Sequence, residues 1–311
     1  MEEQGKVIWM DGRLVPWDEA RVHFVSNTLH YGFGAFEGIR CYRTAKGPAI
    51  FRLKEHVDRL FGSCHILGLK VPYTREQVTE AIRETVRANE METCYIRPMV
   101  YIGYGGMGLQ FKGLPVNVAI AVWYWGEYLG GGALSAGVRV KTSSFVRHHI
   151  NANMVKAKAN ANYLSFQLAK AEAQECGYDE ALLLDVHGNV AEGSVEHIFM
   201  SRHGELKTPP LTCLMEGITR DSLMQLARAE GLAVREEFFS RDELYVAEEA
   251  FFCGTGAEVT PIREVDGRQI GDGKPGPLTS RLQELYFRVV RGEDPRFAHW
   301  LAYVSPRQTG A

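Results

Sequence analysis

The chain has 311 residues, of which 45% are hydrophobic, so it can bury a substantial core and is long enough for two domains. Its formal net charge of −3 and the lack of a basic block argue against nucleic acid as the main partner. No apolar run approaches the roughly 20 residues that cross a bilayer, and the acidic N-terminus does not resemble a signal peptide.

The first half of the chain combines strands with two amphipathic helices. Alternating residues predict strands over 7–17, and a glycine-rich turn follows at 30–42. A helix is predicted at 53–68, ending at Gly68, and a second one begins at Thr74, whose hydroxyl suits a cap. Strands are then expected at 94–103 and 116–125. Four glycines among residues 126–132 place the interdomain linker at 129–137.

The second half opens with a predicted strand at 138–146 and the lysine-bearing segment 151–171, which runs into a helix. Residues 180–200 suggest a strand, a turn and a strand, and a helix follows at 219–231. A strand at 234–239, a short helix ending near Glu249, a strand at 250–256 and a helix at 277–290 complete the chain. The elements do not alternate strictly as βαβ. We therefore expect two α+β domains, a small one at 1–128 and a large one at 138–311.

Two lysines, Lys156 and Lys158, lie in a segment that has no carboxylate between residues 151 and 171. An amine attacks a carbonyl only when neutral, and poorly solvated surroundings favour that form. Tyr163 follows closely. A lysine that forms an imine, with a phenol nearby to tune it, is typical of pyridoxal phosphate chemistry. An ordinary lysine-bearing loop before a helix is the alternative, and this segment alone leaves both open.

Residues 103–108 match the G-x-G-x-x-G pattern of dinucleotide sites. That pattern requires a helix to open within it, whereas here a loop and then a strand follow. A nicotinamide-dependent oxidoreductase is therefore a much weaker alternative, and we interpret the run as a flexible glycine loop.

Several residues are candidates for binding an anion or a cofactor. The turn at 217–221 opens a helix whose first amides suit a phosphate, although an ordinary capped helix has the same pattern. Small residues at 254–257 would expose backbone N–H groups. Glu192 lies beside a glycine at a strand end and would pair with a pyridine nitrogen or face water. Arg59 would clamp a phosphate or be solvated.

Tyr95, Arg97 and Met99 share one face of the strand at 94–103 because successive strand residues alternate between faces. An arginine among aromatic residues there needs an anionic partner. Glu37 and a substrate carboxylate are both possible partners.

The six cysteines contain no C-x-x-C pair and the ten histidines show no ligand spacing. This pattern predicts reduced thiols in a cytoplasm and no metal site.

Together, eight segments resemble the branched-chain amino acid aminotransferases, which are class IV (fold type IV) pyridoxal-phosphate enzymes. They follow the family's order and cover residues 7 to about 290: HYGFGAFEGIRCY, EHVDRL, YIRPMV, WGEYLG, KANANYL, EGSVEHIF, GITRDS and GTGAEVTPI. The resemblance implies a small N-terminal α/β domain and a larger C-terminal pseudo-barrel domain joined by the glycine-rich linker. It also implies a homodimer or a larger assembly of dimers.

The resemblance also implies roles for individual residues. It selects Lys158, four positions before Asn162, as the lysine that bonds pyridoxal 5'-phosphate. The other residues that would hold the cofactor are Arg59, Tyr163, Glu192, Ile218, Thr219 and Thr255. The residues that would bind substrate are Tyr31, Phe36, Tyr95, Arg97, Met107, Trp125, Tyr128, Thr255 and Gly256. Of these, Tyr31 and Met107 would come from a second subunit.

The implied reaction is ping-pong transamination between branched-chain L-amino acids and 2-oxoglutarate. Same-fold alternatives are a D-amino acid aminotransferase, an (R)-amine transaminase, an aminodeoxychorismate lyase and a branched-chain enzyme with secondary (R)-amine activity. A homologue that binds ligand without turnover is a further alternative, which the intact set of candidate residues argues against. His197 stands where the family usually has Asn, Val195 also departs from the pattern, and the loop at 109–115 is shorter than the family's. That loop lies near the expected pocket mouth, so the resemblance implies the reaction type and leaves the substrate range open.

Overall fold

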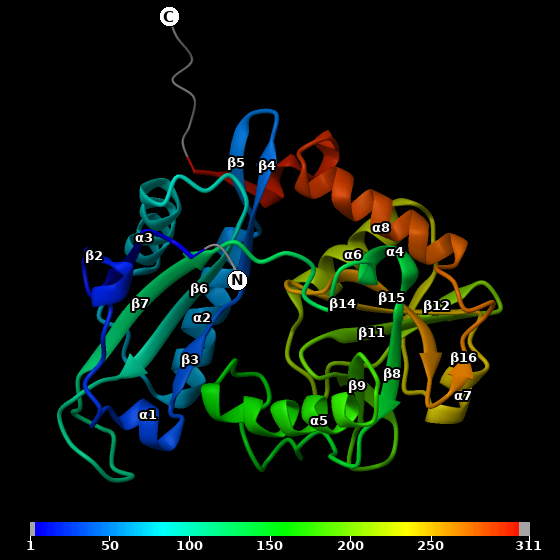
Figure 1. Ribbon diagram of the computed structural model, residues 1–311, viewed down its shortest axis with the longest axis horizontal. Helices are drawn as coiled ribbons and strands as arrows, with labels where there is room; N and C mark the ends of the chain where they lie inside the picture. The colour runs from blue at the N-terminus through cyan, green and yellow to red at the C-terminus, as the bar shows by residue number, and fades with distance from the viewer. Residues whose placement is uncertain (1–3, 305–311) are drawn as a thin grey trace, which may run out of the picture. The chain divides into compact units, whose positions relative to one another are not determined.

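The computed structural model describes residues 4–304, which pack into two compact units (Figure 1). Within residues 4–304, the first unit contains residues 4–125, the short segment Lys156–Ala161 and residues 288–304. The second unit contains Gly126–Val155 and Asn162–Phe287. This partition differs from the expected domain ranges, because two segments assigned from sequence to the large domain pack instead with the first unit, where they meet strands β3 and β5.

In the first unit, eight strands of the described chain form one antiparallel sheet in the order β17-β5-β4-β6-β7-β1-β2, with β3 paired to β6. Their bounds are Val7–Met10 (β1), Arg13–Pro16 (β2), Gly34–Phe36 (β3), Ile39–Thr44 (β4), Gly47–Phe51 (β5), Cys94–Ile102 (β6), Val116–Trp123 (β7) and Leu301–Tyr303 (β17). The strands predicted at 7–17, 94–103 and 116–125 are confirmed.

In the first unit, the end of one long helix and the start of the other lie where their capping residues predict. After the short α1 (Asn27–Tyr31), α2 (Leu53–Leu67) ends at Gly68, whose φ of 71° is the left-handed conformation that glycine adopts most easily. The helix α3 (Arg75–Ala88) is capped by Thr74, which exchanges hydrogen bonds with Gln77 in a capping box. Short 3-10 helices lie at Trp17–Glu19 (η1) and Pro295–Trp300 (η3).

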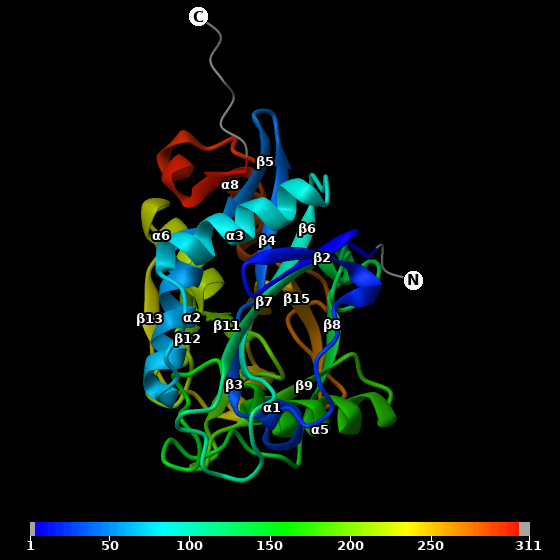
Figure 2. The same cartoon turned by 90° about the vertical axis from the view of Figure 1, so that its left-hand side faces the viewer.

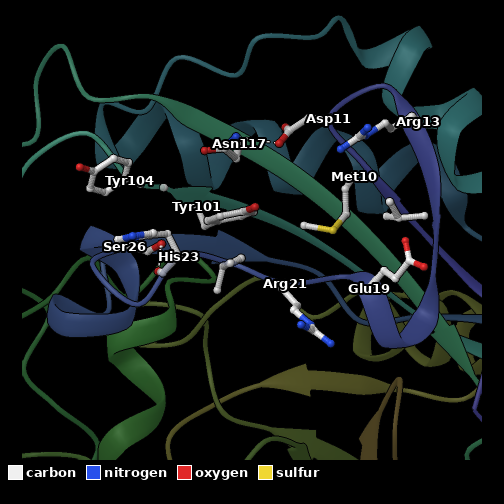
Figure 3. A pocket seen from close by; sticks show the side chains of 13 residues that line it. Met10, Asp11, Arg13, Glu19, Arg21, His23, Ser26, Tyr101, Tyr104 and Asn117 are labelled. Atoms are coloured by element: carbon white, nitrogen blue, oxygen red, sulfur yellow. Dashed lines mark hydrogen bonds between the residues drawn. The ribbon is translucent and has the colours of Figure 1, made fainter.

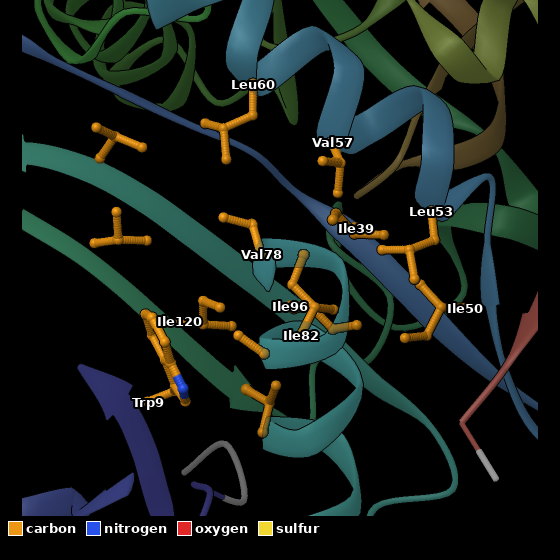
Figure 4. Close-up of a cluster of buried hydrophobic side chains, with 14 of the residues drawn as sticks. Trp9, Ile39, Ile50, Leu53, Val57, Leu60, Val78, Ile82, Ile96 and Ile120 are labelled. Carbon is orange, nitrogen blue, oxygen red and sulfur yellow. The ribbon is translucent and has the colours of Figure 1, made fainter. Parts of the chain in front are cut away.

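The core of the first unit lies between the sheet and the two long helices, which contact β3, β6, β7 and β1 (Figure 2). Fully buried side chains such as Ile39, Ile96 and Ile120 point toward α2 and α3 (Figure 4). Because neighbouring strand residues point to opposite faces, Tyr95 and Arg97 are directed away from this core. The packing of the helices thus leaves these two side chains on the other face of the sheet.

The second unit contains a mixed sheet of nine strands among the described residues, in the order β10-β9-β8-β15-β14-β11-β12-β13, with β16 paired to β15. The strand bounds are Val138–Thr142 (β8), Glu180–Leu184 (β9), Val190–Gly193 (β10), His197–Arg202 (β11), Glu205–Thr208 (β12), Val234–Glu236 (β13), Glu249–Gly254 (β14), Glu258–Val265 (β15) and Arg268–Gln269 (β16). Parallel pairs join β8 to β9, β8 to β15 and β12 to β13. The mixed α+β class is confirmed.

Five α-helices begin in the second unit within residues 4–304: Ala133–Ala136 (α4), Tyr163–Glu175 (α5), Ile218–Ala229 (α6), Arg241–Tyr245 (α7) and Pro277–Val290 (α8). The 3-10 turn η2 (Asn160–Asn162) leads into α5. The helix predicted at 277–290 is confirmed at both ends. No helix in this range combines the length and the apolar character that crossing a bilayer requires.

Three features of the second unit differ from the predicted elements. The strand expected up to residue 200 is divided into β10 and β11 by a tight turn, in which the Gly193 N–H donates to the Glu196 carbonyl at 2.7 Å. The short helix α7 ends at Tyr245, before the expected end near Glu249. The strand β15 was not predicted, because Pro261 within it removes a backbone donor and is uncommon inside strands.

Candidate functional site

The backbone of Lys158 is held on both sides by the first unit. Its N–H donates to Ser63 Oγ of α2 at 2.9 Å, and its carbonyl accepts from the Phe36 N–H of β3 at 3.1 Å. The next residue, Ala159, forms an isolated bridge with Ala35. These contacts fix the position from which the Lys158 side chain extends. Ser63 was not among the predicted site residues.

The Lys158 amine lies over an aromatic ring, with Nζ 5.1 Å from the centre of the Phe36 ring. Burial, reinforced by the positive charge of Arg59, lowers the pKa of Lys158 from 10.5 to about 8, against the opposing effects of Glu37 and Tyr95. At pH 7 roughly one such amine in ten is neutral, far more than for an ordinary lysine. Lys158 is therefore suited to attack a carbonyl.

Arg59 on α2 is held by a fully buried carboxylate. Glu37 accepts from Arg59 Nε at 2.7 Å and from Nη2 at 2.8 Å, and it also contacts His56 Nδ1 at 2.7 Å. Burial alone would raise the pKa of Glu37, but the charge and hydrogen bonds of Arg59 and His56 outweigh it and hold the pKa well below its usual range. Glu37 is thus the partner of Arg59 and His56. Its position in the apolar run GAFEGI was the available sequence signal.

Arg97 is surrounded by aromatic rings. Its guanidinium carbon lies 4.6, 5.2 and 5.7 Å from the ring centres of Phe36, Tyr95 and Trp123, and Nη2 donates to the Tyr95 hydroxyl at 3.0 Å. The buried Nε finds no hydrogen-bond acceptor anywhere in residues 4–304. A buried guanidinium N–H without an acceptor is costly, so this geometry favours an anion brought by a ligand.

Trp125 extends the aromatic surface around Arg97. Its ring lies edge-on to Tyr95 at 4.5 Å and 5.9 Å from Trp123, and its carbonyl accepts from Arg40 at 3.2 Å. A methyl group at Gly38 would overlap the Tyr95 hydroxyl, so glycine is required for this ring to take its place. Trp123 was missed from sequence, although its register opposite Tyr95 puts it on this face.

Two predicted substrate residues lie on exposed parts of the first unit. Tyr31 ends α1 and is 42% exposed, while Met107 is 46% exposed in the loop after β6. Across the described chain, no hydrogen bond or ring contact joins either side chain to Arg97. The run at 103–108 is a loop in which no helix opens, which agrees with its rejection as a dinucleotide site.

In the second unit, Glu192 of β10 forms a buried ion pair with Arg147. The Arg147 guanidinium also lies 4.9 Å from the Phe166 ring centre. Tyr163, the first residue of α5, packs edge-on against the same ring at 5.4 Å. Arg147 was missed from sequence, although an arginine within the mainly apolar and aromatic run SSFVRHH was a possible signal.

The helix α6 begins at Ile218 and Thr219, directly after Gly217. The first amides of an α-helix have no acceptor within the helix, and its dipole favours negative charge there. A methyl group at Gly217 would overlap the ring of His197, so the imidazole edge lies directly against this glycine. The helix start therefore offers N–H donors to an anion, beside the residue that departs from the family pattern.

Thr255, Gly256 and Tyr128 meet at the turn between β14 and β15. Thr255 and Gly256 are half-buried, and a methyl group added at Gly256 would lie 3.4 Å from Tyr128 Cγ. Lys170 Nζ lies 5.8 Å from the Tyr128 ring centre. Tyr128 belongs to the second unit, whereas Trp125 belongs to the first.

A pocket of about 270 Å³ in the first unit contains none of the predicted site residues (Figure 3). Charges of both signs line it, from Asp11, Arg13, Glu19 and Arg21. Asp11 accepts a hydrogen bond from Asn117 at 2.7 Å within it. Its lining mixes positive and negative side chains and forms no cluster of one charge sign, so we assign it no chemistry.

Comparison with known proteins gives a family and close relatives. The family described as amino-transferase class IV matches residues 34–265. A curated protein of Pseudomonas aeruginosa named branched-chain-amino-acid aminotransferase is 51% identical over 304 residues, covering 98% of this chain and 99% of that protein.

Solved structures agree with that likeness. A branched-chain amino acid aminotransferase from T.th. with pyridoxamine 5'-phosphate is 46% identical, has a TM-score of 0.95, and is matched over 97% of this chain and 100% of its own. The same enzyme complexed with N-(5'-phosphopyridoxyl)-L-glutamate is 44% identical over the same shares, with a TM-score of 0.94.

Proposed function

The chain belongs to the class IV aminotransferase family, and on that basis we propose that it transfers amino groups from leucine, isoleucine and valine to 2-oxoglutarate with pyridoxal 5'-phosphate as its cofactor. The observation that carries the proposal is the Lys158 amine, whose pKa is lowered to about 8 by burial and by Arg59. A nucleophilic amine beside a guanidinium suits a cofactor that has both an aldehyde and a phosphate. The absence of a C-x-x-C pair among the six cysteines supports a cytoplasmic setting.

The residues present fit this cofactor. When bound, pyridoxal phosphate supplies an aldehyde that bonds an amine and a ring that accepts electrons from the substrate Cα. Lys158 would bond the aldehyde, and Glu192, which contacts Arg147, would pair with the ring nitrogen. Tyr163 would donate to the phenolic oxygen. The groups that would hold the phosphate are the guanidinium of Arg59, the amides of Ile218 and Thr219, and the hydroxyl of Thr255.

The substrate pocket must accept a branched apolar side chain and also the γ-carboxylate of glutamate. Arg97 and the Tyr95 hydroxyl would bind that carboxylate, because the buried Nε of Arg97 has no acceptor in the described chain. The rings of Phe36, Trp125 and Tyr128 would contact the apolar side chain. The amides of Thr255 and Gly256 would bind the α-carboxylate. The complex of the T.th. enzyme with N-(5'-phosphopyridoxyl)-L-glutamate supports glutamate as one substrate.

Lys158 also has a role as a base. With the cofactor bound, the neutral Nζ would take the proton from Cα of the amino acid in the first half-reaction and pass it to the cofactor. In the second half-reaction it would take a proton from the cofactor and deliver it to the corresponding carbon of 2-oxoglutarate. Its lowered pKa keeps a usable neutral fraction near neutral pH, which general-base catalysis requires. Two backbone hydrogen bonds of Lys158, donated by its N–H to Ser63 Oγ and accepted by its carbonyl from the Phe36 N–H, keep the amine in register for both steps.

A pair of lysine variants tests this function. Lys158→Ala removes the amine and should lower kcat by roughly 10³-fold or more, and borohydride should no longer fix the cofactor to the protein. Lys156→Ala is the matched control and should keep activity and borohydride labelling, because Lys156 lies two residues away in the same segment. Full transamination by Lys158→Ala would contradict the proposal.

We further propose that the enzyme works as a homodimer in which Tyr31 and Met107 of each copy complete the partner's substrate pocket. Their exposed positions, away from Arg97, support this arrangement. Mixing Lys158→Ala with Tyr31→Ala protein should restore activity, because a mixed dimer has one site with both residues intact. Subunits that exchange, as shown by mass, but recover no activity would contradict it.

A further inference from the structure

The first unit contains one fully buried carboxylate that the reaction above does not use. Glu37 is 0% exposed and is bound by Arg59 and His56, which lie three residues apart on one face of α2. We propose that Glu37 is a positioning residue, the counter-charge that lets the Lys158 amine and the Arg59 guanidinium work in one site. This inference rests on the proposed function and adds a residue that controls the protonation of its nucleophile.

The geometry couples Glu37 to Lys158 through the adjacent residue. The Phe36 N–H binds the Lys158 carbonyl at 3.1 Å, and the Phe36 ring lies 5.1 Å from Lys158 Nζ. The Glu37 carboxylate cannot turn away, because Arg59 and His56 bind both of its oxygens, and its charge is one of those that act on the Lys158 amine. A fixed, buried charge acts on its neighbours with little screening by solvent.

The charged and titratable groups around Lys158 come from three elements. Arg59 and His56 lie on α2, Arg97 and Tyr95 on β6, and Glu37 follows β3. The two arginines favour the neutral amine, whereas Glu37 and Tyr95 favour the protonated one. Without Glu37, the two guanidinium groups would act on the amine almost unopposed.

His56 supports the carboxylate without adding a charge. Burial lowers the pKa of His56, although the hydrogen bond and charge of Glu37 oppose that effect. A neutral imidazole donates its Nδ1 hydrogen to the carboxylate. Glu37 and Arg59 then form a pair of zero net charge, and Lys158 is left as the titrating group beside it. The pair also fixes the guanidinium in one orientation, as an anion-binding arginine requires.

The test measures the pKa of Lys158 in the apoprotein by competitive labelling with a small acylating reagent over a pH series, read by mass spectrometry. Glu37→Gln keeps the size of the side chain and removes the charge, so the pKa should fall by roughly one unit from its wild-type value. Arg59→Met should move it in the opposite direction. In the double variant Glu37→Gln/Arg59→Met, the pKa of Lys158 should lie below its value in Arg59→Met by a similar amount, because these two proteins differ only in the Glu37 charge.

The double variant also protects the test against misfolding, because it leaves no buried charge without its partner. Asp58→Asn is the matched control. Asp58 is a solvent-facing carboxylate on α2 that pairs with Lys54 and Arg75, and its replacement should leave the pKa of Lys158 unchanged. The proposal is overturned if the Lys158 pKa stays constant or rises when the Glu37 charge is removed in either background. The labelling needs no turnover, so a protein with no transaminase activity would still give the answer.

Discussion

Around the Lys158 amine, two guanidinium groups, Arg59 and Arg97, oppose one carboxylate, Glu37. They differ in how their own hydrogen bonds are satisfied. Arg59 is bound by Glu37 within the protein, whereas Arg97 has a buried Nε that no residue in the described chain satisfies. The first arrangement suits a permanently held cofactor group. The second suits a substrate carboxylate that arrives and leaves, because the protein supplies no competing acceptor.

Replacing Arg97 should separate the two kinds of substrate. Arg97→Met should raise KM for 2-oxoglutarate by roughly 10- to 100-fold, since a charge-assisted hydrogen bond contributes about 1.5–3 kcal/mol. KM for leucine should change little. Steady-state kinetics with each substrate in turn measures both, and Arg43→Met, an exposed arginine paired with Glu92, is the control. Equal losses for both substrates would show that Arg97 only supports the fold.

The lowered pKa of Lys158 has a consequence for stability. Its folded value is about 8 and its ordinary value is 10.5, so the unfolded chain binds the proton more tightly. The resulting penalty on the folded apoprotein is complete below pH 8 and fades as the pH rises toward 10.5. Lys158→Met should therefore be more resistant to urea than wild type at pH 7, with the advantage shrinking as the pH approaches the ordinary lysine value. An advantage that is independent of pH would contradict this origin.

At the scale of elements, several candidate groups lie in loops that dock on other elements or in the first turn of a helix. The segment 156–161 has no regular structure until η2, yet it is fixed because Lys158 and Ala159 dock on β3 and α2. At α6 the decisive feature is its first turn. Gly217 has no side chain, so the His197 ring can pack against it, next to the first backbone amides of the helix. At the Lys158 segment and at the start of α6, the backbone of one element thus packs against a side chain of another, Ser63 in the first case and His197 in the second.

A methyl group at Gly217 tests the packing at the start of α6. Gly217→Ala should destabilise the protein by about 1–3 kcal/mol, the usual range for overpacking, and weaken binding of pyridoxal phosphate. The backbone of Gly217 has φ −77°, so the expected cause is the His197 ring and not conformational strain. Removing that ring in Gly217→Ala/His197→Ala should restore part of the loss. Urea unfolding and cofactor titration provide the measurements, and additive effects of the two changes would exclude the clash.

At the scale of the whole molecule, the chain returns to the first unit twice after leaving it. The first return, at 156–161, brings Lys158; the second, after α8, adds β17 to the edge strand β5. Trp300 anchors the second return: it is 3% exposed, accepts from the Arg52 N–H at 2.7 Å and packs edge-on to Phe51 at 5.8 Å. The residues that complete the first unit are thus supplied late in the sequence.

Truncating this anchor should weaken the first unit. Trp300→Ala should cost about 3–5 kcal/mol of unfolding free energy, because a large buried side chain is removed and a cavity remains. His299→Ala, an exposed neighbour in the same 3-10 helix, is the control and should change stability by less than about 0.5 kcal/mol. Urea denaturation followed by circular dichroism measures both. Similar small losses for the two variants would show that the second return is not part of the core.

The sequence by itself determined the long helices, most of the strands and the family, because caps, periodicity and ordered motifs are local signals. By resemblance it also predicted Lys158, Arg59 and Glu192 as site residues. Only the tertiary structure decided their contacts: Glu37 binds Arg59, Arg147 pairs with Glu192, and Ser63 accepts from the Lys158 N–H. Each of these contacts joins residues that lie 22 to 95 positions apart in the chain. A buried charge takes its partner from whatever the packed elements bring within reach, and local residue patterns do not encode that proximity.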